Sequence, residues 1–284
     1  MKPYDYILTK QIQWANRSNI KLIGSKGNRG RLAYTKKLDD NLFEPLSSDV
    51  QKNFLKGDGG ELTGKPCKMQ AVHSSSALSV NIFQFWKENN RIPAIASLCD
   101  FCNRNNKSPQ EINFEVKFPI NKKFRYSPNI DVVITNSLQS RFNVYAIECK
   151  FSEAYSREHK GIKPEYLALK EIWSDIPNIY RIAKKISPDD NKFRYLHVAQ
   201  LIKHILGIKQ RFGKNKFRLL YLWYDTIGVE SAIHHNEINE FIEITKEDGI
   251  NFHALSYQEL IIRMANEHRA KHRKYVDYLS ERYL

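Results

Sequence analysis

The sequence lacks an uninterrupted apolar run of the roughly 20 residues that a membrane-spanning helix needs. Its first residues, MKPYDYILTKQ, lack the apolar core of a signal peptide. Cysteine is scarce, because four irregularly spaced residues in a chain of 284 are too few for a disulfide framework. We therefore expect a cytoplasmic protein that does not span a membrane.

One pair of cysteines, Cys99 and Cys102, has a spacing that occurs in zinc and redox sites. A zinc site needs a second pair of ligands. Neither Cys67, Cys149 nor the histidines supply a matching spacing, so reduced and partly buried thiols are the favoured interpretation. We expect Cys149 to fill the back face of its strand.

Acidic residues are outnumbered by basic ones, with 31 Asp and Glu against 45 Lys and Arg and a formal net charge of +14. Such a charge attracts polyanions, and both nucleic acid and an anionic membrane surface meet that description. Without a membrane segment, nucleic acid is the better prediction. The length allows one large domain with a sizeable core.

Regular structure is predicted to be sparse in residues 1–70. Seven of the chain's 12 glycines lie there among many lysines and arginines, and such a density of glycine disfavours long helices and strands. Two interpretations stay open: a basic, glycine-rich arm that follows a phosphate backbone, or a surface segment without a ligand. We expect residues 71–284 to form the main domain.

From His73 onward the hydrophobic pattern becomes regular. Serines 74–76 precede a dense apolar segment that predicts a buried helix, and a short helix follows Pro93. Three strand-like segments come next, at 112–118, 131–135 and 142–147, of which the first alternates with period two. Because the loop at 136–141 is short enough for a hairpin, these strands predict an antiparallel meander.

The second half of the chain is mainly helical. Apolar residues recur at helical spacing over 163–186, where Pro177 is expected to divide the helix, and over 194–212. An interior strand at 217–224, a helix near 236–245, a strand at 251–255 and a terminal helix over 257–284 complete the pattern. The predicted fold class is α/β, a central mixed sheet made of an antiparallel meander plus further strands and flanked by helices.

Polar residues that suit metal chemistry lie on two neighbouring strands of this meander. Asp131 opens one strand, and Glu148 and Lys150 end the next. Residues two apart on a strand point to the same face, so Glu148 and Lys150 project together while Cys149 points away. Mg²⁺ takes one or two protein carboxylates together with water and phosphate oxygens. The arrangement predicts phosphodiester chemistry, although acids and lysines also alternate on ordinary exposed strand ends.

On these residues the chain resembles the PD-(D/E)XK nuclease superfamily, which includes many restriction endonucleases. That core consists of a helix, a three-stranded meander, a second helix and a further strand. Residues 73–224 follow this order with a helical insertion near 155–190, so the resemblance implies a restriction-endonuclease-like core within 71–284.

The chain is similar in particular to bacterial restriction endonucleases that share three sequence features. These are a serine-rich helix start, here at 73–83, a Pro-Asn-Ile-Asp turn, here at 128–131, and a Glu-x-Lys-x-x-Glu motif, here at 148–153. One departure is that the family's Pro-Asp pair is Ile130-Asp131 here, with the proline two positions earlier. The resemblance covers about the middle half of the chain.

The resemblance implies roles for four residues. Asp131 and Glu148 would bind Mg²⁺, for which Mn²⁺ can substitute, and the backbone carbonyl of Cys149 would be a further ligand. Lys150 would orient the attacking water or help to deprotonate it. The implied activity is that of a restriction-type endonuclease that cuts double-stranded DNA, acts as a homodimer and has a companion DNA methyltransferase.

Several further residues are weaker candidates. Glu115 is either a metal ligand or a surface charge paired with Lys117, and the second interpretation is favoured. Glu153 completes the Glu-x-Lys-x-x-Glu motif and would hold a second metal or Lys150, or is a simple loop acid. Gln200 is expected to contact water or phosphate, whereas His204, one helical turn later, is equally compatible with the helix surface.

Two other functions stay open. The first is a DNA-binding protein that keeps the nuclease scaffold without cutting, although such a protein would be expected to have lost an acid or the lysine, and all three are present. The second is a nuclease that acts on RNA or on branched or repair DNA, because loops rather than the fold set the shape of the substrate.

Overall fold

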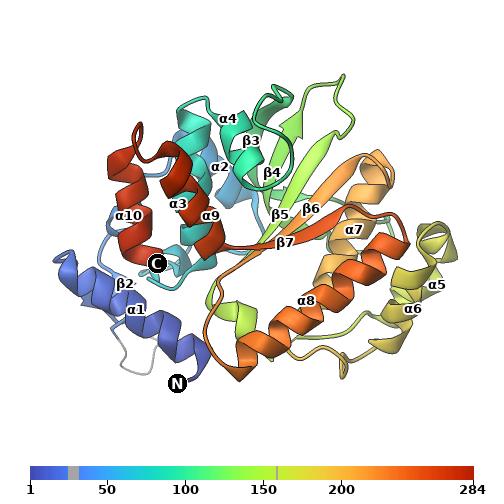
Figure 1. Cartoon of the computed structure of the whole chain (residues 1–284). Coiled ribbons are helices and arrows are strands. Elements are labelled where there is room, and N and C mark those ends of the chain that lie inside the picture. Colours follow the sequence, from blue (N-terminus) through green and yellow to red (C-terminus); the bar gives the residue numbers. More distant parts are fainter. Residues whose placement is uncertain (25–31, 158) are drawn as a thin grey trace.

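A computed structural model describes residues 1–24, 32–157 and 159–284 of the chain. At its centre lies a five-stranded sheet in the order β3-β4-β5-β6-β7 (Figure 1). The strands are β3 (Pro109–Lys117), β4 (Asn129–Asn136), β5 (Val144–Lys150), β6 (Phe217–Trp223) and β7 (Phe252–Ser256). Strands β3 to β5 pair antiparallel and β5 to β7 pair parallel, so the predicted mixed sheet with its meander is confirmed.

Strand β5 is the centre of this sheet. All seven of its residues are buried, including Glu148 and Lys150. A strand that has neighbours on both sides and helices over both faces needs such a continuous apolar sequence, which Val144–Ile147 supplies. The two charged residues at its end therefore lie in the interior of the protein.

Helices cover both faces of the sheet. Helices α3 and α9 lie on one side, and α7 and α8 on the other (Figure 1). The α-helices are α1 (Pro3–Arg17), α2 (Ser48–Lys56), α3 (Ser75–Glu88), α4 (Ile92–Leu98), α5 (Pro164–Ala168), α6 (Pro177–Lys185), α7 (Val198–Phe212), α8 (Val229–Glu247), α9 (Tyr257–His268) and α10 (Arg273–Tyr283). None of the helices in the described ranges is long and apolar enough to cross a bilayer.

Short elements connect the helices and strands. They are the strands β1 (Leu22–Ile23) and β2 (Tyr34–Thr35) and the 3₁₀ helices η1 (Asp39–Asn41), η2 (Lys68–Gln70), η3 (Ser152–Tyr155) and η4 (Lys170–Trp173). Two helix starts agree with the sequence prediction: Ser74 caps α3 by accepting a hydrogen bond from the amide of Ala77, and Pro177 begins α6.

The prediction of one terminal helix over 257–284 was wrong. The chain forms two helices, α9 and α10, and Arg269 donates across the turn between them to Asp277 Oδ1 at 2.7 Å. Helix α9 packs on β7, whereas α10 packs on α1. A single straight helix cannot make both contacts, so tertiary packing divides the helical sequence here.

The prediction that residues 1–70 lack long regular elements was also wrong. Helix α1 has 15 residues and α2 has nine, because the glycines are concentrated outside them, at 24–30 and 57–64. Ile7, Val50 and Phe54 belong to the same hydrophobic core as the sheet. The basic stretch at 25–31 lies outside the described residues, so the arm that follows a phosphate backbone stays a prediction.

A buried arginine joins the two ends of the chain. Arg282 of α10 is 1% exposed, and its guanidinium lies 3.8 Å from the centre of the Trp14 ring of α1. It donates to Gln11 Oε1 at 3.0 Å and to the backbone oxygen of Asn41 at 2.8 Å. In the described part of the chain its partners are neutral, so hydrogen bonds and the aromatic face must compensate for the burial of its charge.

Replacing Arg282 by Met keeps most of the apolar stem but removes every donor. The buried acceptors on Gln11 and Asn41 then lose their partners, and we expect the free energy of unfolding to fall by about 2–4 kcal/mol. Urea unfolding followed by circular dichroism measures this change. Arg273→Met, at an exposed position of the same helix, is the control. Equal effects of the two substitutions would contradict the role given to Arg282.

Candidate active site

The sheet brings the three residues of the predicted motif together. Asp131 lies near the start of β4, and the last registered pair of the antiparallel ladder is Val132 opposite Ile147. One residue further along, Asp131 and Glu148 face each other. The amide of Cys149 donates a hydrogen bond of 2.7 Å to Asp131 Oδ2, which fixes the aspartate against β5.

Glu148 lies between two nitrogen-bearing side chains. Lys150 Nζ is 2.6 Å from one carboxylate oxygen, and His204 Nε2 on α7 is 2.8 Å from the other. Glu148 and His204 are each 1% exposed. Neither contact is aligned as a hydrogen bond, so both carboxylate oxygens are buried ion-pair acceptors that lack a well-oriented donor.

Burial and the neighbouring charges shift the pKa values of Asp131 and Glu148 in opposite directions. Burial raises the pKa of Asp131 well above its usual value, and the charge on Glu148 raises it further. Burial would also raise the pKa of Glu148, but Lys150 and His204 outweigh it and lower that pKa to about 2. Glu148 therefore carries the stable negative charge, and Asp131 is the group that resists ionisation.

Lys150 stays protonated in this setting. Burial disfavours its charge, but the carboxylates of Glu148 and Asp131 more than compensate and raise the pKa of the ammonium. The protonated ammonium can donate hydrogen bonds to water or phosphate, and its positive charge lies beside the carboxylates of Glu148 and Asp131.

The donor set suits a hard divalent cation. Within residues 1–24, 32–157 and 159–284, no three His, Cys, Asp or Glu side chains are grouped as a metal site. Mg²⁺ needs only one or two protein carboxylates, because water and phosphate supply its other ligands. Glu148 is buried and both of its oxygens lack an aligned donor, and Asp131 is half-buried on the adjacent strand, so the two carboxylates meet that requirement.

Cys149 fills the back of β5, as predicted. Its thiol is buried on the face opposite Glu148, where burial raises its pKa and the hydroxyl of Tyr257 is its neighbour. The side chain therefore points away from that of Glu148, although the charge of Asp131 also raises the pKa of the thiol, and the role of the backbone carbonyl stays a prediction. Cys99 and Cys102 are free thiols, of which Cys99 is buried.

Glu115 is partly buried and lies near enough to Asp131 and Glu148 to interact with them electrostatically. The favoured interpretation, a pair with Lys117, was wrong, because Lys117 Nζ lies 2.7 Å from Asp58 Oδ1 instead. Glu115 contacts the side-chain amide of Asn129, two residues before Asp131. Burial raises the pKa of Glu115 to about 7, and the charge on Glu61 adds to that shift.

Glu61, from the loop between α2 and η2, is a residue that sequence reasoning missed. Its pKa is raised by burial and lowered by Lys68, whose Nζ is 4.0 Å away, and the negative charge of Glu153 raises it again. Glu61 thus brings a further carboxylate to the neighbourhood of Glu115 and Glu153. Its glycine-rich surroundings carry no motif, so only the fold reveals it.

Helix α7 supplies His204 and Gln200 on one face. The interpretation of His204 as a possible surface residue was wrong, since it is buried against Glu148. Its spacing of four from Gln200 was the signal, because such residues share a helix face. Gln200 lines a cavity together with His204.

That cavity, of about 750 Å³, opens beside the carboxylate cluster. Four parts of the chain form its wall: the segment up to the first residue of β4, the insertion between β5 and α6, the segment between α6 and α7, and α7. The lining residues include Tyr126, Asn129, His159, Lys163, Tyr166, Asp189, His197, Gln200, Lys203 and His204. Because Asn129 contacts Glu115 and His204 contacts Glu148, these acids lie directly behind two residues of the cavity wall.

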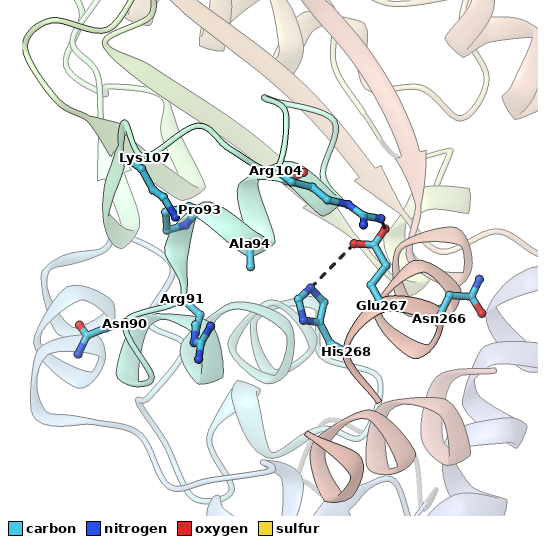
Figure 2. A pocket seen from close by; sticks show the side chains of 10 residues that line it. Asn90, Arg91, Pro93, Ala94, Arg104, Lys107, Asn266, Glu267 and His268 are labelled. Atoms are coloured by element: carbon cyan, nitrogen blue, oxygen red, sulfur yellow. Dashed lines mark ion pairs between the residues drawn. The ribbon is translucent and has the colours of Figure 1, made fainter. Parts of the chain in front are cut away.

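A second cavity, of about 790 Å³, lies between α4 and the end of α9 (Figure 2). Arg91, Arg104 and Lys107 make it basic, but its single acid, Glu267, is paired with Arg104 at 2.6 Å. It adjoins the C-terminal end of the 14-residue helix α3, whereas Ser76 near the other end contacts Glu61. A helix length of roughly 21 Å therefore separates this cavity from the carboxylates.

A family model described as Restriction Endonuclease associating with ARP matches residues 8–284. The chain belongs to this family. No curated protein and no solved structure matches the chain significantly. Membership of the restriction-endonuclease family confirms the predicted relation to these enzymes, and the match includes the N-terminal region that provides Glu61. The assignment to the PD-(D/E)XK superfamily stays a prediction.

Replacing Glu115 by Gln tests the carboxylate cluster. Because the folded pKa of about 7 exceeds the ordinary value of 4.5, the folded protein binds more protons than the unfolded chain between these pH values, and stability is lost as the pH rises through 7. At pH 8 we expect E115Q to be more stable than the wild type by up to about 3 kcal/mol. The difference should vanish towards pH 4.5.

Urea titrations in a chelator measure this difference without divalent cations. Glu111→Gln, at an exposed position of the same strand, is the matched control and is expected to change little at either pH. Equal stability of E115Q and the wild type at pH 8 would show that Glu115 does not share a crowded negative site.

Proposed function

We propose that the protein is a Mg²⁺-dependent endonuclease of restriction type that hydrolyses phosphodiester bonds of double-stranded DNA on a PD-(D/E)XK core. The observation that carries the proposal is the buried carboxylate of Glu148, which lies opposite Asp131 and in contact with Lys150 and His204. Family membership and the net charge of +14 support the same function.

Asp131, Glu148 and the backbone carbonyl of Cys149 would hold the ion, for which Mn²⁺ can substitute. Glu115 lies near enough to interact electrostatically with Asp131 and Glu148, and Glu153 with Lys150, so both are further candidate ligands. When bound, the divalent cation supplies neutralisation of the charge that develops on the phosphate and promotes deprotonation of water.

The protein's own side chains supply position and charge. Lys150 Nζ, held protonated beside Glu148, orients the attacking water or contacts a phosphate oxygen. His204 Nε2 contacts one carboxylate oxygen of Glu148, and the other carboxylate oxygen faces Lys150 Nζ. Gln200, on the cavity wall, is placed to contact water or phosphate from α7. Since Glu148, Lys150 and His204 are buried and in contact before substrate arrives, little reorganisation of these three groups is needed during reaction.

Partners follow from the same proposal. Cleavage of both DNA strands uses two copies of one site, so a homodimer is proposed. A companion DNA methyltransferase would protect host DNA, and the association with ARP that the family description states is proposed for this chain too.

Removing any of the three central groups tests the chemistry. We expect Asp131→Asn, Glu148→Gln and Lys150→Met each to lower the rate of plasmid cleavage in Mg²⁺ at least about 100-fold, because the two acids would hold the metal ion and Lys150 would orient water or phosphate. DNA binding should remain. Calorimetric titration with Mg²⁺ should show weaker binding for Asp131→Asn and Glu148→Gln but not for Lys150→Met.

Glu111→Gln, outside the site, is the control and should cut at the wild-type rate. A wild type that binds DNA but cuts none in Mg²⁺ or Mn²⁺ would favour the non-cleaving DNA-binding protein instead. If the protein cut only RNA or branched DNA, the proposed substrate, double-stranded DNA, would be wrong, but the roles of Asp131, Glu148 and Lys150 would stand.

His204 is proposed as a positioning residue for Glu148. His204→Ala removes the contact with Glu148, and we expect metal affinity and cleavage rate to fall about 10–100-fold, as for other residues that orient a metal ligand. His204→Gln keeps a side-chain donor at similar reach and should recover part of both. If the Gln variant is as impaired as the Ala variant while both remain folded, the contact does not act by orienting Glu148.

A further inference from the structure

The cavity beside Glu148 is larger, and its lining side chains are chemically more varied, than contact with a phosphate backbone requires. Protein contacts to DNA phosphates are made by cationic and polar groups on a surface, and they need no enclosed space. Here a space of about 750 Å³ adjoins the acids through two of its own wall residues, Asn129 and His204.

Aromatic rings line part of this wall. Tyr126, in the segment before β4, is 66% exposed, so its ring is available for contact. Tyr166 of α5 is held in place by Phe124, whose ring stacks on it at 4.0 Å between centroids and 15° between planes. Rings placed in this way provide surfaces on which a base can stack, and such stacking tolerates any base.

Two lysines on the wall lack acidic partners. Among the described residues, no carboxylate lies within ion-pair distance of Lys163 or Lys203. Burial lowers the pKa of Lys203, and the positive charge of Lys163 lowers it further. Two like charges gathered at the mouth of a cavity are stabilised by an anion, and phosphate is the anion of the proposed substrate.

Four buried polar atoms of wall residues have no hydrogen-bond partner in the described part of the chain. His204 Nε2 and His159 Nδ1 lie within ion-pair distance of Glu148 and Asp190, whereas Asn129 Oδ1 and His204 Nδ1 have no such neighbour. Buried polar groups are rarely left unpaired, because each costs free energy comparable to a lost hydrogen bond. The carboxamide oxygen of Asn129 and the ring nitrogen of His204 are therefore free to form hydrogen bonds with a ligand. The edge of a nucleobase carries suitable donors and acceptors.

We propose that this cavity takes one nucleotide that is turned out of the DNA double helix, next to the phosphodiester bond that is cut. The inference rests on the proposed function and specifies the form of its substrate. Tyr126 and Tyr166 would stack on the base, Asn129 and His204 would contact its edge, and Lys163 and Lys203 would hold the adjoining phosphates. A base inside a paired duplex cannot reach such a cavity without leaving the stack.

Binding without metal tests the inference separately from cleavage. Duplexes of randomised sequence, with or without a single unpaired nucleotide, are titrated with the wild-type protein in a chelator, and dissociation constants are measured by fluorescence anisotropy. An unpaired base has already lost its stacking and pairing, so we expect the wild type to bind the duplex with the unpaired nucleotide at least about fivefold more tightly.

Tyr126→Ala supplies the variant, because an exposed side chain can be removed without disturbing the core. We expect it to reduce the preference to near unity, and Lys203→Gln to weaken binding of both duplexes. Leu138→Ala, at a 91% exposed position of the β4–β5 hairpin, is the control and should keep the preference. A 2-aminopurine at the unpaired position should change its fluorescence with the wild type and not with Tyr126→Ala.

The outcomes separate the two proposals. Equal affinity for the two duplexes, with no change of 2-aminopurine fluorescence, overturns the inference even if the protein cuts DNA in Mg²⁺. A preference that Tyr126→Ala abolishes supports the cavity's role even if no metal supports cleavage, and in that case the catalytic proposal fails alone. Absence of binding to every DNA tested overturns the inference.

Discussion

The structure depends on a buried charge that must be compensated. Glu148 lies on the central strand, 1% exposed, and an isolated carboxylate at that depth would be prohibitively costly. Lys150 at 2.6 Å and His204 at 2.8 Å compensate for it, so β5 and α7 have to meet at this point. Removing one partner would leave the buried charge with only the other to compensate for it, which destabilises the folded state. The arrangement keeps Glu148 ionised, while Asp131 opposite it resists ionisation.

Around this centre the protein concentrates charge of both signs. Glu61, Glu115 and Glu153 add negative charge on one side, and Lys163 and Lys203 add positive charge at the cavity. Like charges at close range destabilise the folded state, and such strain is typical of sites that await ligands of opposite charge. A divalent cation among the acids and phosphates among the lysines would relieve both repulsions, and a nucleic acid with its metal ion supplies the two together.

The N-terminal region is part of the structure that holds this site. Its helix α1 is joined to α10 through Arg282, and its loop at 57–64 carries Glu61 to the acids. The same arginine contacts Asn41, so the segment between the two N-terminal helices is tied to the end of the chain. The family match likewise extends over residues 8–284 and not only over the sheet.

The sequence by itself determined where the strands lie and which residues share a face of the same strand. Period two on β5 places Glu148 and Lys150 on one face and Cys149 on the other, and this follows from strand geometry alone. Tertiary structure decided what sequence periodicity cannot express. It broke the terminal helix at 269–272, brought Glu61 from a glycine-rich loop, turned Glu115 inward through Asn129, and buried His204. Each of these depends on contacts between residues far apart in the chain, and local pattern holds no record of such contacts.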